Sequence, residues 1–180
     1  MRIDVDSTDA GLTLIELIVG LLVSTLVLIA IATTLANAFI AQDDVTTTTQ
    51  ATSRGQLMSS AVERAMRNAR AYKVDGTDGN DLYVWTTLGG SQTCQAFRLI
   101  AGTARIASGP GPINAPSTWP IWQTGIAQRS IAGSPVLFFT ETSDGVTYTF
   151  DIKTKAAPVR FDGAAIVRFT SAGGTNPCWS

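Results

Sequence analysis

The chain has 180 residues, of which 13 are basic and 14 are acidic, and its formal net charge is −1. It contains no histidine, which excludes histidine acid–base catalysis and histidine metal ligation within the chain. Its two cysteines are too few for a structural zinc site, and the near balance of charges does not favour a strong polyanion binder.

The N-terminal quarter of the chain divides into a polar leader and an apolar helix candidate. Residues 1–11 form a short, polar and acidic segment, and 12–42 are predominantly apolar. No residue in 17–42 carries a formal charge, and apolar side chains would occupy all faces of a helix there. Such a helix would rise about 39 Å, which exceeds the hydrocarbon thickness of a bilayer. We therefore predict a membrane-spanning helix over 12–42.

An acidic residue, Glu16, stands at the start of this apolar run. Placing a charged side chain at the centre of a bilayer costs about 2.5–3.5 kcal/mol of free energy. We therefore expect Glu16 to have a function. A secretory signal would explain the small residues Ala36-Asn37-Ala38, but neither the acidic leader nor the length of the run. A plain membrane anchor would explain the length and leave Glu16 unexplained. Cleavage on the cytoplasmic side, after Gly11, is the third interpretation.

Cleavage after Gly11 would give Glu16 a role. Leu12 would become the first residue, with an α-amine that is largely protonated near neutral pH because its pKa is about 7.7–8.0. Leu12 and Glu16 are one helical turn apart and share a face. In a stack of such helices, Glu16 of one chain could pair with the amine of a neighbour, and a wrong register would leave a charge unpaired.

The heptad GLTLIEL at 11–17 closely resembles the class III signal of type IV pilins and type II secretion pseudopilins. In that family a dedicated membrane peptidase cuts after the glycine and methylates the new N-terminus. The resemblance implies that Gly11 is the processing point, Leu12 the methylated N-terminus and Glu16 the assembly contact. It also implies three partners: the prepilin peptidase, other pilin or pseudopilin subunits, and the inner (cytoplasmic) membrane.

Three departures from the family pattern favour a minor over an abundant subunit. The leader carries Arg2 among three aspartates, where the family usually has a basic leader. The first mature residue would be Leu12 rather than phenylalanine. No proline occurs between Leu12 and Ala71, although major pilins often carry one in the apolar helix.

Helical periodicity continues beyond the apolar run, so we expect an amphipathic continuation of the helix over 43–73. The residues that recur at three- and four-residue steps are Leu57, Met58, Ala61, Val62, Ala65, Met66, Ala69 and Tyr72. The other side carries Glu63, Arg64, Arg67 and Arg70, which we interpret as a solvated face, with a partner site as the alternative. Glu63 and Arg67 have the favourable spacing for an ion pair. The threonine run at 46–49 and Gly55 predict a soft or kinked joint.

A C-terminal β-sheet domain is expected over 74–180. The predicted strands are 82–87, 95–101, 103–107, 119–123, 136–141, 146–152 and 164–170. Asp144-Gly145 predicts a hairpin, Asp162-Gly163 a turn before the last strand, and 109–120 a long loop. One long helix followed by strands predicts an α+β fold, here a pilin-like helix with an antiparallel sheet.

The sheet region adds a weaker resemblance, to J-type pseudopilins and PilW-like minor pilins. The segments that carry it are 62–69, 97–99, Phe138-Phe139 and 164–169. The alternative is any amphipathic helix that leads to a sheet.

Several residues of the sheet region have a structural and a functional interpretation. If the domain is exported, a Cys94–Cys178 disulfide is the simplest pairing, and two separate thiols are the alternative. Trp119 and Trp122 fit core packing better than an interface, and Trp179 would be held beside the bridge. The calcium-type oxygens of Asp75, Asp78, Asn80 and Asp81 lack EF-hand spacing, and turn formation explains them without an ion.

The sequence predicts an assembly role and no enzyme. It contains no nucleophile–base constellation and no phosphate-binding loop, so no cofactor or metal is expected. We expect an exported, single-pass minor pilin or pseudopilin subunit, with its C-terminal domain outside the cytoplasm, that initiates or caps a filament. Two alternatives remain: a DNA-binding minor pilin of a DNA-uptake (competence) machine, and a plain membrane-anchored exported binding domain.

Overall fold

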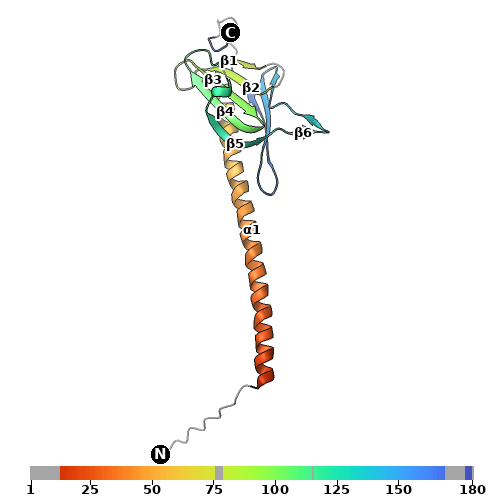
Figure 1. Cartoon of the computed structure of the whole chain (residues 1–180). Helices are drawn as coiled ribbons and strands as arrows, with labels where there is room; N and C mark the ends of the chain where they lie inside the picture. The colour runs from red at the N-terminus through yellow and green to blue at the C-terminus, as the bar shows by residue number, and fades with distance from the viewer. Residues whose placement is uncertain (1–12, 76–78, 115, 169–176, 180) are drawn as a thin grey trace, which may run out of the picture. The chain divides into compact units, whose positions relative to one another are not determined.

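The computed structural model describes residues 13–75, 79–114, 116–168 and 177–179. One 54-residue helix, α1 (Leu14–Arg67), precedes a domain of antiparallel strands, as Figure 1 shows. The expected α+β class is confirmed, and the arrangement of one long apolar helix followed by an antiparallel sheet is pilin-like. Gly11 and Leu12 lie outside the described residues.

The chain forms two compact units that divide after Asp43. In the first unit, every side chain of 14–43 is exposed. Within the described part of the chain, α1 is the one helix long and apolar enough to cross a membrane. The three threonines of 14–43 donate their hydroxyls to the backbone: Thr25 donates to the Leu21 carbonyl at 2.7 Å, and Thr33 and Thr34 donate to that of Ala30 at 3.0 and 2.8 Å. These hydroxyls are therefore satisfied without water.

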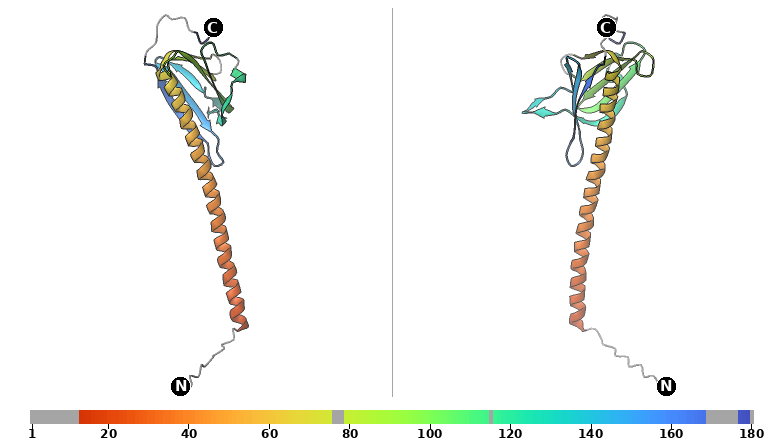
Figure 2. Two further views of the ribbon diagram at one scale, coloured as in Figure 1. Left: turned by 90° about the vertical axis from the view of Figure 1, so that its left-hand side faces the viewer. Right: turned by 180° about the vertical axis from the view of Figure 1, so that it is seen from behind.

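The second unit joins the remaining turns of α1 to the sheet. One face of α1 is buried here at three- and four-residue steps, as the amphipathic pattern predicts. Its buried residues are Ala51, Gly55, Met58, Val62, Ala65 and Met66. Leu57 was expected on this face and is 52% exposed. Figure 2 shows the strands lying around these last turns of α1.

The predicted helix end at 73 is wrong, because α1 ends at Arg67 and 69–74 form strand β1 (Ala69–Val74). Asn68 makes the change: its side-chain amide caps the Arg64 carbonyl at 2.8 Å, and its own carbonyl accepts from the Thr87 amide at 3.1 Å. From Ala69 onwards the backbone pairs with β2 (Asp81–Thr86) instead of with the preceding helical turn.

The predicted joint at 46–55 is also wrong, since α1 passes through it unbroken. Thr47, Thr49 and Thr52 donate their hydroxyls to carbonyls three or four residues back, at 2.8–3.1 Å, so they do not interrupt the ladder. Gly55 serves packing. A Cβ there would overlap the ring of Phe161, which stacks on Phe150 with ring centroids 5.1 Å apart.

We expect Gly55→Ala to destabilise the sheet domain by about 1–3 kcal/mol, because overpacking of the Phe161 ring outweighs the better helix propensity of alanine. Thermal unfolding of the full chain in detergent, followed by circular dichroism, measures this. Gln56→Ala, on the exposed side of the same turn, is the matched control. A Gly55→Ala chain that melts above the wild type would show that propensity, and not packing, governs this site.

The main sheet has the strand order β1-β2-β3-β4-β5-β9-β10, and β8 also pairs with β9. The strands after β2 are β3 (Thr93–Ile100), β4 (Gly102–Gly109), β5 (Ile121–Ala127), β8 (Phe139–Thr142), β9 (Gly145–Ile152) and β10 (Val159–Ile166). A separate two-stranded sheet joins β6 (Ser130–Ile131) to β7 (Ser134–Pro135). The Tyr72 hydroxyl on β1 donates to the Thr142 carbonyl on β8 at 3.3 Å, so the sheet curves enough to bring these strands together.

Most strand predictions correspond to observed strands, but one turn prediction and one strand boundary need correction. Asp144-Gly145 does form the β8–β9 hairpin, where Thr142 pairs with Gly145. Asp162-Gly163 is no turn, because both residues lie inside β10, and the Tyr148 ring packs against Gly163 so closely that a Cβ would overlap it. The loop expected at 109–120 contains the 3-10 helix η1 (Pro116–Thr118), and β5 begins two residues later than predicted.

Candidate functional site

The described start of α1 carries a helix cap that includes Glu16, the candidate assembly residue. The backbone amide of Glu16 lies 3.0 Å from the Thr13 carbonyl and 3.4 Å from its hydroxyl oxygen. Thr13 followed three residues later by Glu16 is the spacing of a capping box. The sequence prediction missed this role of Thr13, although the Thr-x-x-Glu pattern was a readable signal.

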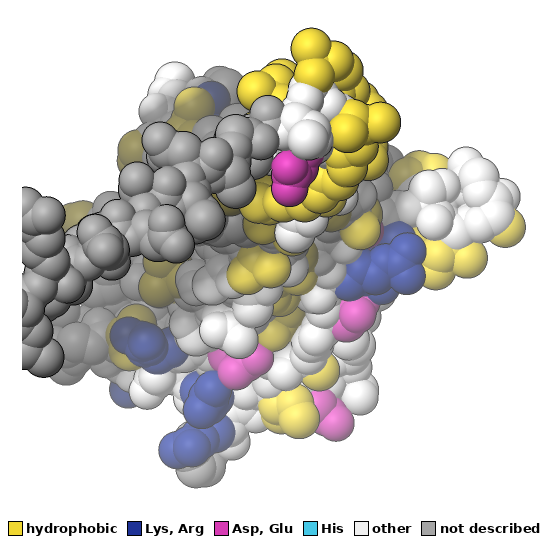
Figure 3. Space-filling view, turned by 90° about the horizontal axis from the view of Figure 1, so that it is seen from below, with side chains coloured by type: hydrophobic (Ala, Val, Ile, Leu, Met, Phe, Trp, Pro, Cys, Tyr) yellow, Lys and Arg dark blue, Asp and Glu magenta, His cyan; other side chains and the backbone are white. Residues whose placement is uncertain are grey.

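The cap gives Glu16 a local function that competes with the intersubunit one. A carboxylate in the first turn is favoured by the helix dipole, by about 0.3–1 kcal/mol at an exposed site. Glu16 is exposed, however, and the side chains that follow it along α1 are apolar and exposed as well. Figure 3, seen from below, shows hydrophobic side chains as a yellow surface around this end of the helix. A local cap does not account for that surface, whose length and apolar composition are compatible with a membrane span.

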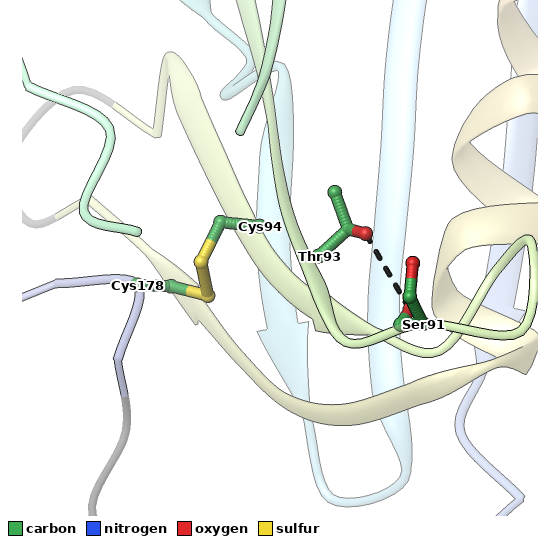
Figure 4. Close-up of a disulfide and its surroundings, with 4 residues drawn as sticks. All are labelled: Ser91, Thr93, Cys94 and Cys178. Atoms are coloured by element: carbon green, nitrogen blue, oxygen red, sulfur yellow. Dashed lines mark hydrogen bonds between the residues drawn. A yellow bond between two sulfur atoms is a disulfide. The ribbon is translucent and has the colours of Figure 1, made fainter. Parts of the chain in front are cut away.

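The structure brings Cys94 and Cys178 together in a disulfide, with Cα atoms 5.4 Å apart (Figure 4). Both cysteines are buried with Trp85, and Ile113 and Trp179 pack beside them. The Ile113 amide also donates to the Cys178 carbonyl at 3.3 Å. The bridge spans 84 residues and attaches 177–179 to strand β3.

The tryptophans lie where packing was expected to place them. Trp119 is 4% exposed, donates its indole N–H to the Asn114 carbonyl at 3.0 Å, and meets Tyr83 edge-on at 5.9 Å. Trp122 packs against Phe97, with ring centroids 6.3 Å apart. Trp179 lies beside the disulfide.

The described candidate calcium residues take part in backbone pairing and in an ion pair. The Asp75 amide donates to the Asp81 carbonyl at 2.9 Å, and the Asp81 carboxylate pairs with Arg98 at 3.2 Å. Asp78 lies outside the described residues. Within 13–75, 79–114, 116–168 and 177–179, no three acidic or cysteine side chains are grouped as metal ligands would be.

A basic recess of about 390 Å³ opens at the C-terminal end of α1, lined by Ser60, Arg64, Arg67, Asn68 and Arg168. Glu63 pairs with Arg67 at 2.9 Å, as its spacing predicted, and accepts a hydrogen bond from the Tyr148 hydroxyl at 2.8 Å. Burial is the main reason that the pKa of Tyr148 is raised above its usual value. Arg168 therefore lies beside Arg64 and Arg67 of the predicted solvated basic face. This proximity could not be predicted from the sequence.

Comparisons of the chain with protein-family models, with curated proteins and with solved structures found no match.

Proposed function

We propose that this chain is a minor pilin or pseudopilin subunit, exported and then assembled through its N-terminal helix into a type IV pilus or a type II secretion-like filament. The observation that carries the proposal is the heptad at 11–17 placed directly at the start of a helix whose side chains are exposed throughout 14–43. A peptidase signal alone, or an apolar helix alone, would be weak support. Their direct succession supports both processing and assembly.

The proposed assembly route follows from the helix surface. Before assembly, the apolar side chains of 14–43 lie in the cytoplasmic membrane, and the sheet domain lies outside the cytoplasm. The Cys94–Cys178 disulfide supports that location, because disulfides persist in oxidising compartments. In the filament, helices of neighbouring subunits replace the lipid. The work of the chain is assembly at the start or tip of the filament, and no reaction is catalysed.

We expect Glu16→Gln to separate the two roles of Glu16. Glutamine can serve at the third position of a capping box but carries no charge to pair with the α-amine of a neighbour. Loss of about 1.4 kcal/mol of pairing would lower incorporation about tenfold. The measurement is the ratio of this chain in sheared filaments to the chain left in membranes.

Thr13→Ala is the matched control, since it removes the capping hydroxyl and keeps the acid. The charge-pairing proposal predicts that Thr13→Ala assembles far better than Glu16→Gln. If the Glu16→Gln chain enters filaments as well as the wild type while the Thr13→Ala chain does not, the charge-pairing proposal is wrong. Glu16 would then act only in the helix cap.

DNA binding is the second candidate function, and the basic recess favours it. Arg64, Arg67 and Arg168 could contact phosphates, whereas the near-neutral charge of the whole chain weighs against strong binding. The detergent-solubilised chain would bind duplex DNA with an affinity that falls as salt rises, and Arg64→Gln with Arg168→Gln would reduce both affinity and salt slope. A plain anchored binding domain would keep residues 1–11 and enter no filament.

A further inference from the structure

The β6–β7 hairpin projects from the sheet domain and buries none of its own residues. Ser130 pairs with Pro135 and Ile131 with Ser134, so the loop has only two residues, Ala132 and Gly133. Their φ angles of 50° and 83° are those of a type I′ turn. All residues of 130–135 are exposed, and Ile131 is 62% exposed. Figures 1 and 2 show the hairpin extending away from the main sheet.

The base of this hairpin is held by a partly buried ion-pair network, whose outer carboxylate, Asp162, is 59% exposed. The Arg129 side chain, only 15% exposed, donates to Asp151 on β9 at 3.1 Å and to Asp162 on β10. The bond to Asp162 is the main cause of a raised Arg129 pKa, against the opposing effect of burial. The Arg129 carbonyl accepts from the Val136 amide at 2.8 Å, and the Gln128 side chain donates to the Val136 carbonyl at 3.0 Å. Two strands of the main sheet thus set the direction of the hairpin.

The stability of the domain does not explain this arrangement. Two-stranded hairpins are marginal on their own. Ala132 is also the one non-glycine residue with a positive φ in the described part of the chain, a conformation that alanine disfavours. The marginal hairpin and the unfavourable φ of Ala132 both lower stability, and they hold the exposed Ile131 in a fixed position. This combination points to a contact outside the chain.

The chemistry of the hairpin defines the surface it would meet. Residues 130–137 carry no charged side chain, and Ile131 and Leu137 are exposed. The tip of the hairpin at the right of Figure 3 shows only hydrophobic and uncharged side chains. So small an element cannot supply the roughly 800 Å² per partner of a stable interface. Its partner must be held nearby by another contact, which raises the effective concentration to about the millimolar range.

We propose that the hairpin 130–135 is a docking arm that places Ile131 in an apolar, uncharged depression on the sheet domain of the adjacent filament subunit. This inference rests on the proposed function, because the shared membrane or filament provides the tether. Arg129 is a positioning residue: its ion pairs with Asp151 and Asp162 aim the arm, and it does not touch the partner.

Site-specific photo-crosslinking in intact filament-forming cells tests the arm. Both native cysteines are in the disulfide, so Ala132→Cys adds a single free thiol for a maleimide–benzophenone label. We expect a crosslink to a subunit that bears a pilin signal, identified by mass spectrometry. The matched control is Ser91→Cys, in the exposed β2–β3 turn, which should give about tenfold less of that product.

Substitution of the anchoring isoleucine provides the second measurement. In the Ala132→Cys background, Ile131→Asp should lower the crosslink about tenfold, while leader cleavage and the melting temperature stay unchanged because the side chain is exposed. The inference is overturned if cleavage and filament entry are normal but position 132 gives no subunit crosslink, or if Ile131→Asp crosslinks like its parent. A chain that is neither cleaved nor incorporated overturns the proposed function and the arm together.

Discussion

Replacing Gly11 with valine is expected to leave residues 1–11 on the chain and to keep the chain out of filaments. The signal that this chain resembles is cut directly after its glycine, and a branched side chain beside the scissile bond should block the cut. Leu12 would then have no free amine, so Glu16 of a neighbouring subunit would lose its proposed partner. Intact-mass measurement of membrane and filament fractions would show both effects.

Ala10→Val is the matched control, because it adds the same side chain one residue before the proposed signal. Normal cleavage of Ala10→Val and loss of cleavage in Gly11→Val would assign the specificity to Gly11. A Gly11→Val chain with the wild-type N-terminus would refute the processing proposal. If both chains begin at Phe39, directly after the small-residue site Ala36-Asn37-Ala38, the secretory-signal interpretation replaces the pilin-type one.

Removal of the disulfide is expected to lower the free energy of unfolding of the sheet domain by about 2–4 kcal/mol. The bridge closes a long loop, and its loss would also release Trp85, Ile113 and Trp179 from a shared apolar cluster. For a domain of this size, the melting temperature should fall by about 6–20 °C. The double variant Cys94→Ala with Cys178→Ala avoids leaving a lone thiol, and thermal unfolding measures the difference.

The matched control is the wild-type chain melted in reducing agent, which should approach the double variant. Limited proteolysis should then cut first near 177–179, because the bridge attaches these residues to β3. A reduced chain that melts within about 1 °C of the oxidised one would show that the disulfide contributes little to this fold, despite the chain-entropy expectation.

The features that could be predicted from the sequence are those with strong local signals. The uncharged run at 17–42 specifies a helix by length and composition. Asp144-Gly145 specifies a hairpin because the flanking runs are apolar and each can pair. The Cys94–Cys178 pairing followed because the chain has only two cysteines.

The errors occurred where long-range contacts outweigh local signals. Ala69 and Tyr72 fit a helical period and a strand equally well, and the pairing of β1 with β2 decides between them. Gly55 is a helix breaker by propensity, yet the ring of Phe161 more than one hundred residues later explains its position. Gly163, beside Asp162, belongs to β10 because the Tyr148 ring needs the space.

The hairpin 130–135, our proposed docking arm, could not be predicted from the sequence for a related reason. Strands of two residues, such as β6 and β7, are too short to produce a periodic pattern. The residue that holds them, Arg129, finds its partners on β9 and β10, far along the chain. Only the folded sheet shows that Arg129 pairs with these two carboxylates at the base of the hairpin.

The N-terminus of the wild-type chain, recovered from membranes of cells that contain a prepilin peptidase, tests the central claim most directly. Intact-mass and terminal-peptide spectrometry should find a chain that begins at Leu12 with one methyl group on its α-amine. A chain that begins at Met1, or one that begins beyond the apolar helix, would contradict assembly through Glu16 and the pilin-type function proposed for this protein.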